Sequence, residues 1–491
     1  MYWANFLHFY QPFDQQKDIL EMVVNQSYRP ILRGIKSNPK ARITLNVSGA
    51  LTELFVRYNY NDLVEDLKYL GERGQLEFTS SAKYHTFLPL VSKNEIIRQI
   101  KANDKTNRSI LGESYQPKGF FPPEMGYARI VSEVVEEMGY KWLLIDEIAY
   151  DGHVEQVKYD RLYKIKNRNL KVFFRERRVS NMIMGSIVRS DETLCEALQD
   201  DLKSNRYLLT GMDGETFGHH RPGLEKLLLE MYQSSKYQLV HISELEKYFQ
   251  KIEEVEPIES TWASSPEDIK RKVQFLSWLD PENKIHLWQK DFSDWVLKRV
   301  REIDPKASNY EELMDNMDIA LASDHFWWAS AKPWWSLEMI EVGAYRLLNI
   351  VKNLPDVTVE EKRRAQDYYQ NIFSTACEWQ RSGKIREMAQ EQKAILRIPL
   401  KERIEPQGFE NVIKLMQEQI EKAVLSQEFE KAILWRDAIV KLREKNDIYD
   451  LVHAVDLLRV EVPGDKMQEL VDQYNIDYQK IRGGQPEQRG A

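Results

Sequence analysis

The sequence predicts an α/β fold over its first half and a helical region after it. Short apolar runs alternate with amphipathic stretches from residue 1 to about residue 250, and helical periodicity dominates from there to about residue 380. Polar side chains gather just after several of the apolar runs. Strand–helix alternation at this spacing is typical of a largely parallel sheet, and active sites are built at the carboxyl edge of such a sheet.

Short apolar runs are the predicted strands of this sheet. Segments of helical period, such as 128–138 and 224–233, separate them. The predicted strands cover residues 2–7, 42–47, 76–80, 119–121, 142–145, 172–175, 208–212 and 238–241. The polar residues that follow strands are His8, Glu124, Asp146, Glu147, Arg175 and Asp213.

The second half of the chain carries helical signals, and a turn-rich stretch at 256–266 separates it from the first. The predicted helices cover 273–279, 292–303, 309–321, 336–351 and 360–373. We predict a first domain at 1–255, a helical domain at 256–398 that packs on it and completes a cleft, and a C-terminal helical region at 399–491. The last part contains a charged helical hairpin at 409–445 and, from Gly483, a tail predicted to be disordered.

Composition excludes several classes of protein. With 491 residues the chain is too long for one ordinary core. A net charge of −8 argues against a nucleic-acid or anionic-membrane surface, which needs clustered positive charge. The two cysteines, Cys195 and Cys377, lie far apart in no metal-ligand spacing. No apolar stretch of spanning length and no signal-like leader is found, so a cytoplasmic protein is expected.

The most polar cluster runs from Gly211 to His220 and contains Asp213, Glu215 and His219. It follows an apolar strand, and its glycines let a ligand approach the backbone. Two acids and two histidines in eight residues are too polar for a core turn. The alternative is a solvated loop with a capping aspartate; the strand-end position favours a functional cluster.

A second candidate is Glu124, which follows an apolar strand and two prolines. The stiff backbone suits a nucleophile that must stay in place. The alternative is a glutamate at a helix N-terminus, favoured by the helix dipole, because helical period resumes at Ala128. Taken alone, this glutamate does not separate the two interpretations.

The pair of carboxylates is more informative than either alone. Glycoside cleavage passes through an oxocarbenium-like state, in which one carboxylate attacks or stabilises the anomeric carbon and a protonated carboxyl delivers a proton to the leaving oxygen. Glu124 and Asp213, at the ends of two different strands, fit that requirement.

The sequence resembles glycoside hydrolase family 57, whose members share five short motif regions in a fixed order. All five are found here over about 330 residues. They are His8-Phe9-Tyr10-Gln11-Pro12; Gly74-Gln75-Leu76-Glu77-Phe78-Thr79 with Tyr84-His85 and Leu88-Pro89-Leu90; Phe121-Pro122-Pro123-Glu124; Met212-Asp213-Gly214-Glu215; and Ala322-Ser323-Asp324-His325-Phe326.

The resemblance implies a distorted, TIM-like (β/α)7 barrel followed by a helical domain. It also implies double displacement on α-1,4-glucans or maltooligosaccharides, with Glu124 as nucleophile, Asp213 as general acid/base, and neither metal nor cofactor. Amylase-like hydrolysis and 4-α-glucanotransferase-like transfer both remain open. The expected substrate-binding residues are His8, Gln11, His85, Asp146, Arg175, His220, Asp324 and Trp327. Arg175 could pair with a site carboxylate and hold Glu124 ionised.

The chain also departs from the family pattern. Tyr10 replaces the second histidine of the first motif, and Pro122-Pro123 replaces the commoner Trp-Leu-Pro. Neither departure removes a catalytic carboxylate, but both bear on substrate identity. The Trp-rich loop at 326–335 is either a sugar-stacking platform, with Trp327 in it, or interdomain core.

Two hypotheses from other classes stay open. Asp213 with His219 and His220 could bind a metal, as in polysaccharide deacetylases, although adjacent histidines point apart on regular elements. A catalytically silent glucan-binding scaffold is the other, against which the retention of both carboxylates speaks. The hairpin at 409–445 resembles the UVR motif, which implies protein contact or self-association; its alternative is an ordinary helical hairpin.

Overall fold

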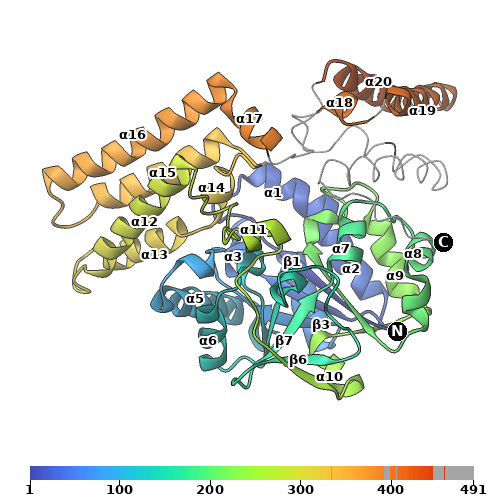
Figure 1. Cartoon of the computed structure of the whole chain (residues 1–491), viewed down its shortest axis with the longest axis horizontal. Coiled ribbons are helices and arrows are strands. Elements are labelled where there is room, and N and C mark those ends of the chain that lie inside the picture. The colour runs from blue at the N-terminus through green and yellow to red at the C-terminus, as the bar shows by residue number, and fades with distance from the viewer. Residues whose placement is uncertain (333, 392–398, 405, 446–457, 459–491) are drawn as a thin grey trace.

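The computed structural model describes the chain except residues 333, 392–398, 405, 446–457 and 459–491. The barrel, the helical region beside it and a separate C-terminal hairpin are distinct in Figure 1. The predicted tail from residue 483 lies outside the described residues. Among those described, no helix is long and apolar enough to cross a membrane.

Seven parallel strands form the barrel, in the order β8-β1-β2-β3-β4-β5-β7. They are β1 (Tyr2–Phe9), β2 (Ile43–Val47), β3 (Leu76–Ser80), β4 (Gly119–Phe120), β5 (Trp142–Asp146), β7 (Lys171–Arg175) and β8 (Tyr207–Asp213). The sheet curls until its two ends meet, where the backbone N–H of Glu176 donates to the carbonyl of Leu209 at 2.9 Å. The predicted barrel is confirmed.

Three further strands extend this sheet. β9 (Gln238–Val240) runs parallel to β1, while β6 (Leu162–Ile165) pairs antiparallel with β7 and parallel with β10 (Ile252–Val255). The sequence predicted β9 but neither β6 nor β10. The two strands, Leu-Tyr-Lys-Ile and Ile-Glu-Glu-Val, are only four residues long and do not alternate apolar and polar positions, so they carry no period-two signal.

Helices follow most of the strands and cover the barrel. They are α1 (Lys17–Val23), α2 (Arg29–Ser37), α3 (Gly49–Arg57), α4 (Asn61–Glu72), α5 (Lys93–Leu111), α6 (Arg129–Glu137), α7 (Arg177–Met184), α8 (Asp191–Lys203), α9 (Glu225–Gln233) and α10 (Leu245–Tyr248). In α6, Val131, Val134 and Val135 form a buried stripe at helical spacing, which is why this segment packs as a helix on the sheet.

Strand β1 shows how the sheet separates two cores. Trp3 and Leu7 pack in the cluster on one face, whereas Ala4 and Phe6 pack in the cluster on the other. Successive side chains of a strand point to opposite faces. His8 therefore shares the face of Ala4 and Phe6, and its ring lies 4.7 Å from that of Phe121.

The helical region has a core of its own. Its elements are α11 (Pro266–Lys270), α12 (Lys284–Arg301), α13 (Tyr310–Ala320), α14 (Asp324–Trp327), α15 (Leu337–Lys352), α16 (Val359–Ser382) and α17 (Lys384–Glu391). The helix predicted at 273–279 is wrong, because the chain there forms consecutive turns. Trp278 is buried there and stacks on Phe87 of the barrel at 4.4 Å, so contact with the barrel overrides the local helical period.

Ion pairs hold this helical core against the barrel. Arg301 on α12 bonds Glu95 on α5 at 2.6 Å and Asp318 on α13 at 2.8 Å, and Arg98 on α5 also reaches Asp318 at 2.7 Å. Glu95 and Asp318 are almost fully buried, so these pairs are screened little by solvent. The division into domains at 255 and 398 remains our proposal.

The predicted C-terminal hairpin is confirmed as two helices, α19 (Pro406–Leu425) and α20 (Phe429–Arg443), preceded by α18 (Leu400–Arg403). They enclose a small core around Met416 and Trp435, and Ile187 of the barrel packs against it. Protein contact or self-association through this hairpin stays a prediction.

A buried ion-pair network fastens the barrel where its two ends meet. Arg175, at the end of β7, donates from Nε to the carbonyl of Gly211 on β8 at 2.6 Å and from Nη1 to Asp146 at 3.0 Å. Asp146, which is fully buried, also accepts from Nε of Arg177 at 2.6 Å. Arg177 reaches on to the carbonyl oxygens of Trp262 at 3.0 Å and Ser264 at 2.8 Å. The carboxylate of Asp146 on β5 is thus linked through Arg175 to β8 and through Arg177 to the segment that contains Trp262 and Ser264.

The change Asp146→Asn should therefore destabilise the fold strongly. It leaves the almost fully buried guanidinium of Arg175 without its counter-charge, a loss of about 3–5 kcal/mol in the free energy of unfolding. Urea titration followed by circular dichroism measures it. The control is Asp160→Asn, whose partner Arg161 is paired at a half-exposed carboxylate, where the loss should stay below about 1 kcal/mol. Equal losses in the two variants would contradict the network's role.

Candidate active site

The predicted catalytic residues lie at the carboxyl edge of the barrel. Asp213 is the last residue of β8, and Glu124 lies in the 3₁₀ turn η4 (Pro123–Met125) just after β4. The negative charge of Asp213 raises the pKa of Glu124. His8 pairs with Asp213 in the register of β1 and β8 and bonds His85, whose Nδ1 lies 3.8 Å from Oε1 of Glu124. The two carboxyls therefore belong to one site although they lie far apart in the sequence.

The backbone at Glu124 is strained. Its φ of 62° and ψ of 17° place it in the left-handed region, and Met125 follows with φ 49°. For residues other than glycine this conformation costs about 1–3 kcal/mol each, and it persists only where the surroundings impose it. Here Tyr127 and Ser260 exchange backbone hydrogen bonds of 2.8 and 3.2 Å, and the Trp262 N–H donates to the Glu124 carbonyl at 3.3 Å. Segment 258–262 thus clamps the turn.

Trp262 also holds the Glu124 side chain. Its indole N–H donates to Oε2 at 2.7 Å, while Nδ1 of His85 lies 3.8 Å from Oε1. Burial and the charge of Asp213 raise the pKa of Glu124 to about 8, and the bond from Trp262 opposes this rise. The sequence did not single out Trp262. Its only local signal was a tryptophan inside the turn-rich stretch at 256–266.

A chain of neutral histidines lines one side of the site. His8 Nδ1 bonds Oδ1 of Asn46 at 2.8 Å, its Nε2 bonds Nε2 of His85 at 3.1 Å, and His85 Nδ1 bonds Oγ of Ser323 at 3.0 Å. Burial lowers the pKa of His8 to about 4 and that of His85 well below its usual value. Both rings are uncharged at neutral pH. An amide oxygen only accepts, so Nδ1 of His8 carries the proton that is donated to Asn46. Nε2 of the neutral His8 ring is then an acceptor, and Nε2 of His85 carries the proton between the two rings.

Tyr10, the departure in the first motif, occupies a defined position. Its ring stacks on His85 with centroids 4.0 Å apart and planes 14° apart. Its hydroxyl donates to Oδ2 of Asp324 at 2.6 Å. Burial raises the pKa of Asp324 to about 6, and the bond from Tyr10 opposes the rise. The fifth motif is thereby tied to the first, and the helical region is tied to the barrel.

A second buried carboxyl lies behind Asp213. Glu215 accepts from the hydroxyl of Tyr28 and from Nε2 of Gln11, the latter at 3.0 Å. Burial and the charge of Asp213 raise the pKa of Glu215 to about 8. Burial also raises the pKa of Asp213 to about 6, while the charge of Arg175 opposes it. The sequence placed Glu215 in a motif but gave it no role.

The remaining predicted residues divide into two groups. Three of them bond other side chains of the protein. Gln11 bonds Glu215, and Asp146 bonds both Arg175 and Arg177. His220 is exposed, and it follows His219, which bonds Gln26 at 2.7 Å. Contact of these residues with a sugar stays a prediction. Arg175, expected to hold Glu124 ionised, instead acts on the pKa of Asp213.

The Trp-rich loop forms a cluster of half-exposed indoles. Trp327 stacks on Trp334 with centroids 4.5 Å apart, and Trp328 meets Trp327 edge-on at 4.9 Å. The three indoles are partly exposed and pack on one another. Within the part of the chain that the structure describes, no group of three or more His, Cys, Asp or Glu residues could hold a metal ion.

Comparison with known proteins agrees with the family resemblance that the five motifs indicated. The model of glycosyl hydrolase family 57 matches residues 4–259, and the UvrB/uvrC motif matches residues 410–445. Alpha-amylase 1 of Dictyoglomus thermophilum is 26% identical over 315 residues, covering 60% of this chain and 45% of that protein. The 4-alpha-glucanotransferase of Thermococcus litoralis is 22% identical over 353 residues, covering 65% of this chain and 53% of that protein. The chain spans about half the length of these curated relatives.

Solved structures share the fold. The T. litoralis 4-alpha-glucanotransferase has a TM-score of 0.55 at 19% identity and covers 72% of this chain and 58% of its own. A GH57-type branching enzyme from Pyrococcus horikoshii has a TM-score of 0.57 at 16% identity and covers 76% of this chain and 95% of its own. Since the family model spans more than half of the sequence, from β1 to the clamp segment beside Glu124, the chain belongs to glycosyl hydrolase family 57.

Proposed function

We propose that this chain is a retaining glycoside hydrolase or transglycosylase that acts on α-1,4-glucans. The observation that carries the proposal is the position of Glu124 and Asp213 after β4 and β8 at the carboxyl edge of the barrel, where His8 and His85 lie between them. With pKa values of about 8 and about 6, the pair holds one proton and one negative charge at neutral pH. Double displacement needs that combination, a carboxylate to attack and a carboxyl to protonate the leaving oxygen.

Glu124 is the proposed nucleophile and Asp213 the proposed general acid/base. In the free site the pKa of Glu124 is the higher, so the shared proton resides on Glu124. Attack requires the proton on Asp213. The N–H of Trp262 favours this state, because it donates to Oε2 and stabilises the anion. A bound sugar displaces water from the partly exposed Asp213 and raises its pKa, so that the proton moves from Glu124 to Asp213.

The groups proposed to bind the sugar are His8, His85 and Asp324, with Trp327 further out. Neutral imidazoles and a carboxylate suit hydroxyl groups, since they offer both donors and acceptors, and half-exposed indoles suit the apolar face of a sugar ring. An α-glucan as substrate is supported by the relatives named as alpha-amylase and 4-alpha-glucanotransferase. Hydrolysis and transfer differ in whether water or a second sugar enters the site after the first displacement.

Incubation with maltoheptaose should yield a ladder of maltooligosaccharides. Glu124→Gln and Asp213→Asn should each lower kcat by at least about 10²–10⁴-fold, since each removes one of the two groups that the chemistry requires. Chromatography of the products measures the rates, and thermal unfolding checks the fold.

The control is Asp291→Asn, on the exposed face of α12, which should keep the wild-type rate. Turnover that survives in both site variants would remove the proposed roles. Activity abolished by EDTA would favour the metal-dependent deacetylase hypothesis, and binding of glucan without turnover would favour the silent scaffold. Products longer than maltoheptaose would indicate transfer as well as hydrolysis.

Trp262→Phe should shift the pH dependence of the reaction. Loss of the indole donor removes a bond to the charged form of Glu124, so the already raised pKa of Glu124 rises further. The acidic limb of kcat/KM should move to higher pH by about one to two units. Trp288→Phe, at a partly buried tryptophan that packs against the core of the helical region, is the matched control and should leave the limb in place. An unchanged limb in Trp262→Phe would show that the indole does not tune the nucleophile.

A further inference from the structure

The proposed acid/base Asp213 is held differently from the proposed nucleophile. The indole of Trp262 bonds the carboxyl of Glu124, whereas the carboxyl of Asp213 makes no capping bond to the turn that follows it. The backbone on either side therefore sets the direction of Asp213. β8 precedes it, and the 3₁₀ turn η6 (Gly214–Thr216) follows it. A contact that moves η6 also moves the acid/base carboxyl.

A π-helical segment, η1 (Val24–Tyr28), holds this turn. It lies between α1 and α2, and its last two residues, Ser27 and Tyr28, are fully buried. Oγ of Ser27 donates to the carbonyl oxygen of Gly214 at 2.7 Å, and the hydroxyl of Tyr28 donates to the carboxyl of Glu215. Two consecutive residues of η1 thus bond two consecutive residues of η6, directly after Asp213.

The sequence explains why the helix widens here. Pro30, in the first turn of α2, has no N–H for the carbonyl of Gln26, and its ring would clash with that carbonyl in a regular α-helix. The wider turn of a π-helix accommodates the proline, and such segments are frequent at functional sites. The same carbonyl meets the loop after η6 at Gly218, which has φ 107° and no space for a Cβ. The two segments therefore pack backbone against backbone.

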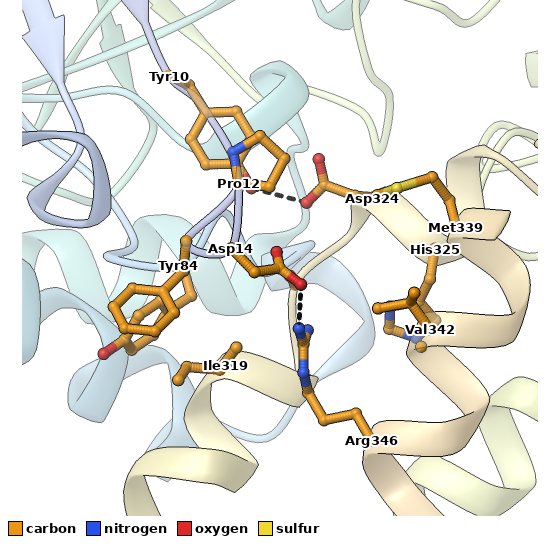
Figure 2. Close-up of a pocket in the computed structure, with 13 residues that line it drawn as sticks. Tyr10, Pro12, Asp14, Tyr84, Ile319, Asp324, His325, Met339, Val342 and Arg346 are labelled. Atoms are coloured by element: carbon orange, nitrogen blue, oxygen red, sulfur yellow. Dashed lines mark hydrogen bonds and ion pairs between the residues drawn. The ribbon is translucent and has the colours of Figure 1, made fainter. Parts of the chain in front are cut away.

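The hydroxyl of Tyr28 is fixed in place by contacts of its ring. The ring stacks on Phe9 of β1 with centroids 4.3 Å apart, and Phe9 in turn leaves no space for a Cβ at Gly214. The hydroxyl also lies 3.1 Å from the carbonyl oxygen of Tyr10, whose side chain bonds Asp324 of the helical region (Figure 2). Tyr28 thus lies where the first and fourth motifs meet, although it belongs to neither.

The two carboxyls of the site have separate supports. Segment 258–262 holds the turn at Glu124, and η1 holds the turn after Asp213. Attack on the anomeric carbon and delivery of a proton to the leaving oxygen are also separate tasks. Delivery requires the acid within hydrogen-bond reach of that oxygen, and a misplacement of about 1 Å can cost about 10²-fold in rate. A change in η1 should therefore slow proton delivery and spare the attack.

We propose that Ser27 and Tyr28 are positioning residues for the general acid, which hold η6 so that the carboxyl of Asp213 points at the leaving oxygen. The proposal rests on the function proposed above. It predicts that the loss of either hydroxyl matters only for substrates whose leaving group needs a proton.

Tyr28→Phe tests this role, because it removes the hydroxyl and keeps the ring that stacks on Phe9. We compare kcat/KM for maltoheptaose with kcat/KM for α-maltotriosyl fluoride. With the fluoride, Glu124 forms its bond to the anomeric carbon while the C–F bond breaks, and fluoride departs without a proton from Asp213. We expect a loss of about tenfold or more for maltoheptaose and of less than about threefold for the fluoride. Ser27→Ala is a second variant with the same expectation.

Tyr237→Phe is the matched control. Its buried hydroxyl also donates to a carboxylate, that of Asp191 at 2.6 Å, but its ring packs on Trp3 at the amino end of β1, the edge opposite the site. It should keep both rates. Trp262→Phe is the contrasting variant, because it acts on the nucleophile, and it should lower the rates of both substrates at neutral pH.

Equal losses on the two substrates in Tyr28→Phe and Ser27→Ala would show that η1 supports the site as a whole and does not position the acid. Unchanged rates on both substrates would equally overturn the positioning role, while the proposed activity stands. A wild type that cleaves neither substrate would overturn the proposed function itself. Thermal unfolding of each variant checks the fold.

Discussion

A single buried carboxylate holds together the parts of the chain on which the site depends. Asp146 at the end of β5 binds Arg175, which bonds the carbonyl of Gly211 on β8, and Arg177, which bonds the segment that carries Trp262. Burying these charges is costly, and the cost is offset only because every partner is in place. The closing of the barrel and the placing of the segment that holds Glu124 therefore depend on the same buried carboxylate.

The same low-polarity environment governs the chemistry. Burial raises the pKa values of Glu124, Asp213, Glu215 and Asp324 together, so the site cannot carry all four negative charges at neutral pH. Each carboxyl has a group that opposes the rise: an indole for Glu124, a phenol for Glu215 and another for Asp324, and a guanidinium for Asp213. The protein sets the distribution of protons by the strength of these separate contacts, while the histidines stay neutral and add no charge.

Part of this arrangement can be predicted from the sequence and part cannot. The continuous apolar run 142–145 identifies a buried parallel strand, and the positions of Glu124 and Asp213 after such runs place them at one edge of the sheet. Trp262 and Tyr28 lie in none of the motifs, because their roles arise from contacts with Glu124 and Glu215, which are 138 and 187 residues away in the sequence. At 273–279 a local signal in the sequence proved wrong. Its helical period predicted a helix, but the chain forms turns there and Trp278 packs on the barrel.

The left-handed turn at Glu124 has a consequence for which part of the chain can keep the geometry of the site by itself. Both acids and every strand of the barrel lie before residue 256, yet the strained turn is held from residues 258–262. A fragment that ended with β10 would retain both acids but lose the segment that holds the turn at Glu124. The barrel is thus not an autonomous module that could be exchanged or transplanted at its last strand. The unit that keeps this geometry extends into the connecting segment at 258–262, because that segment holds a turn far upstream in the sequence.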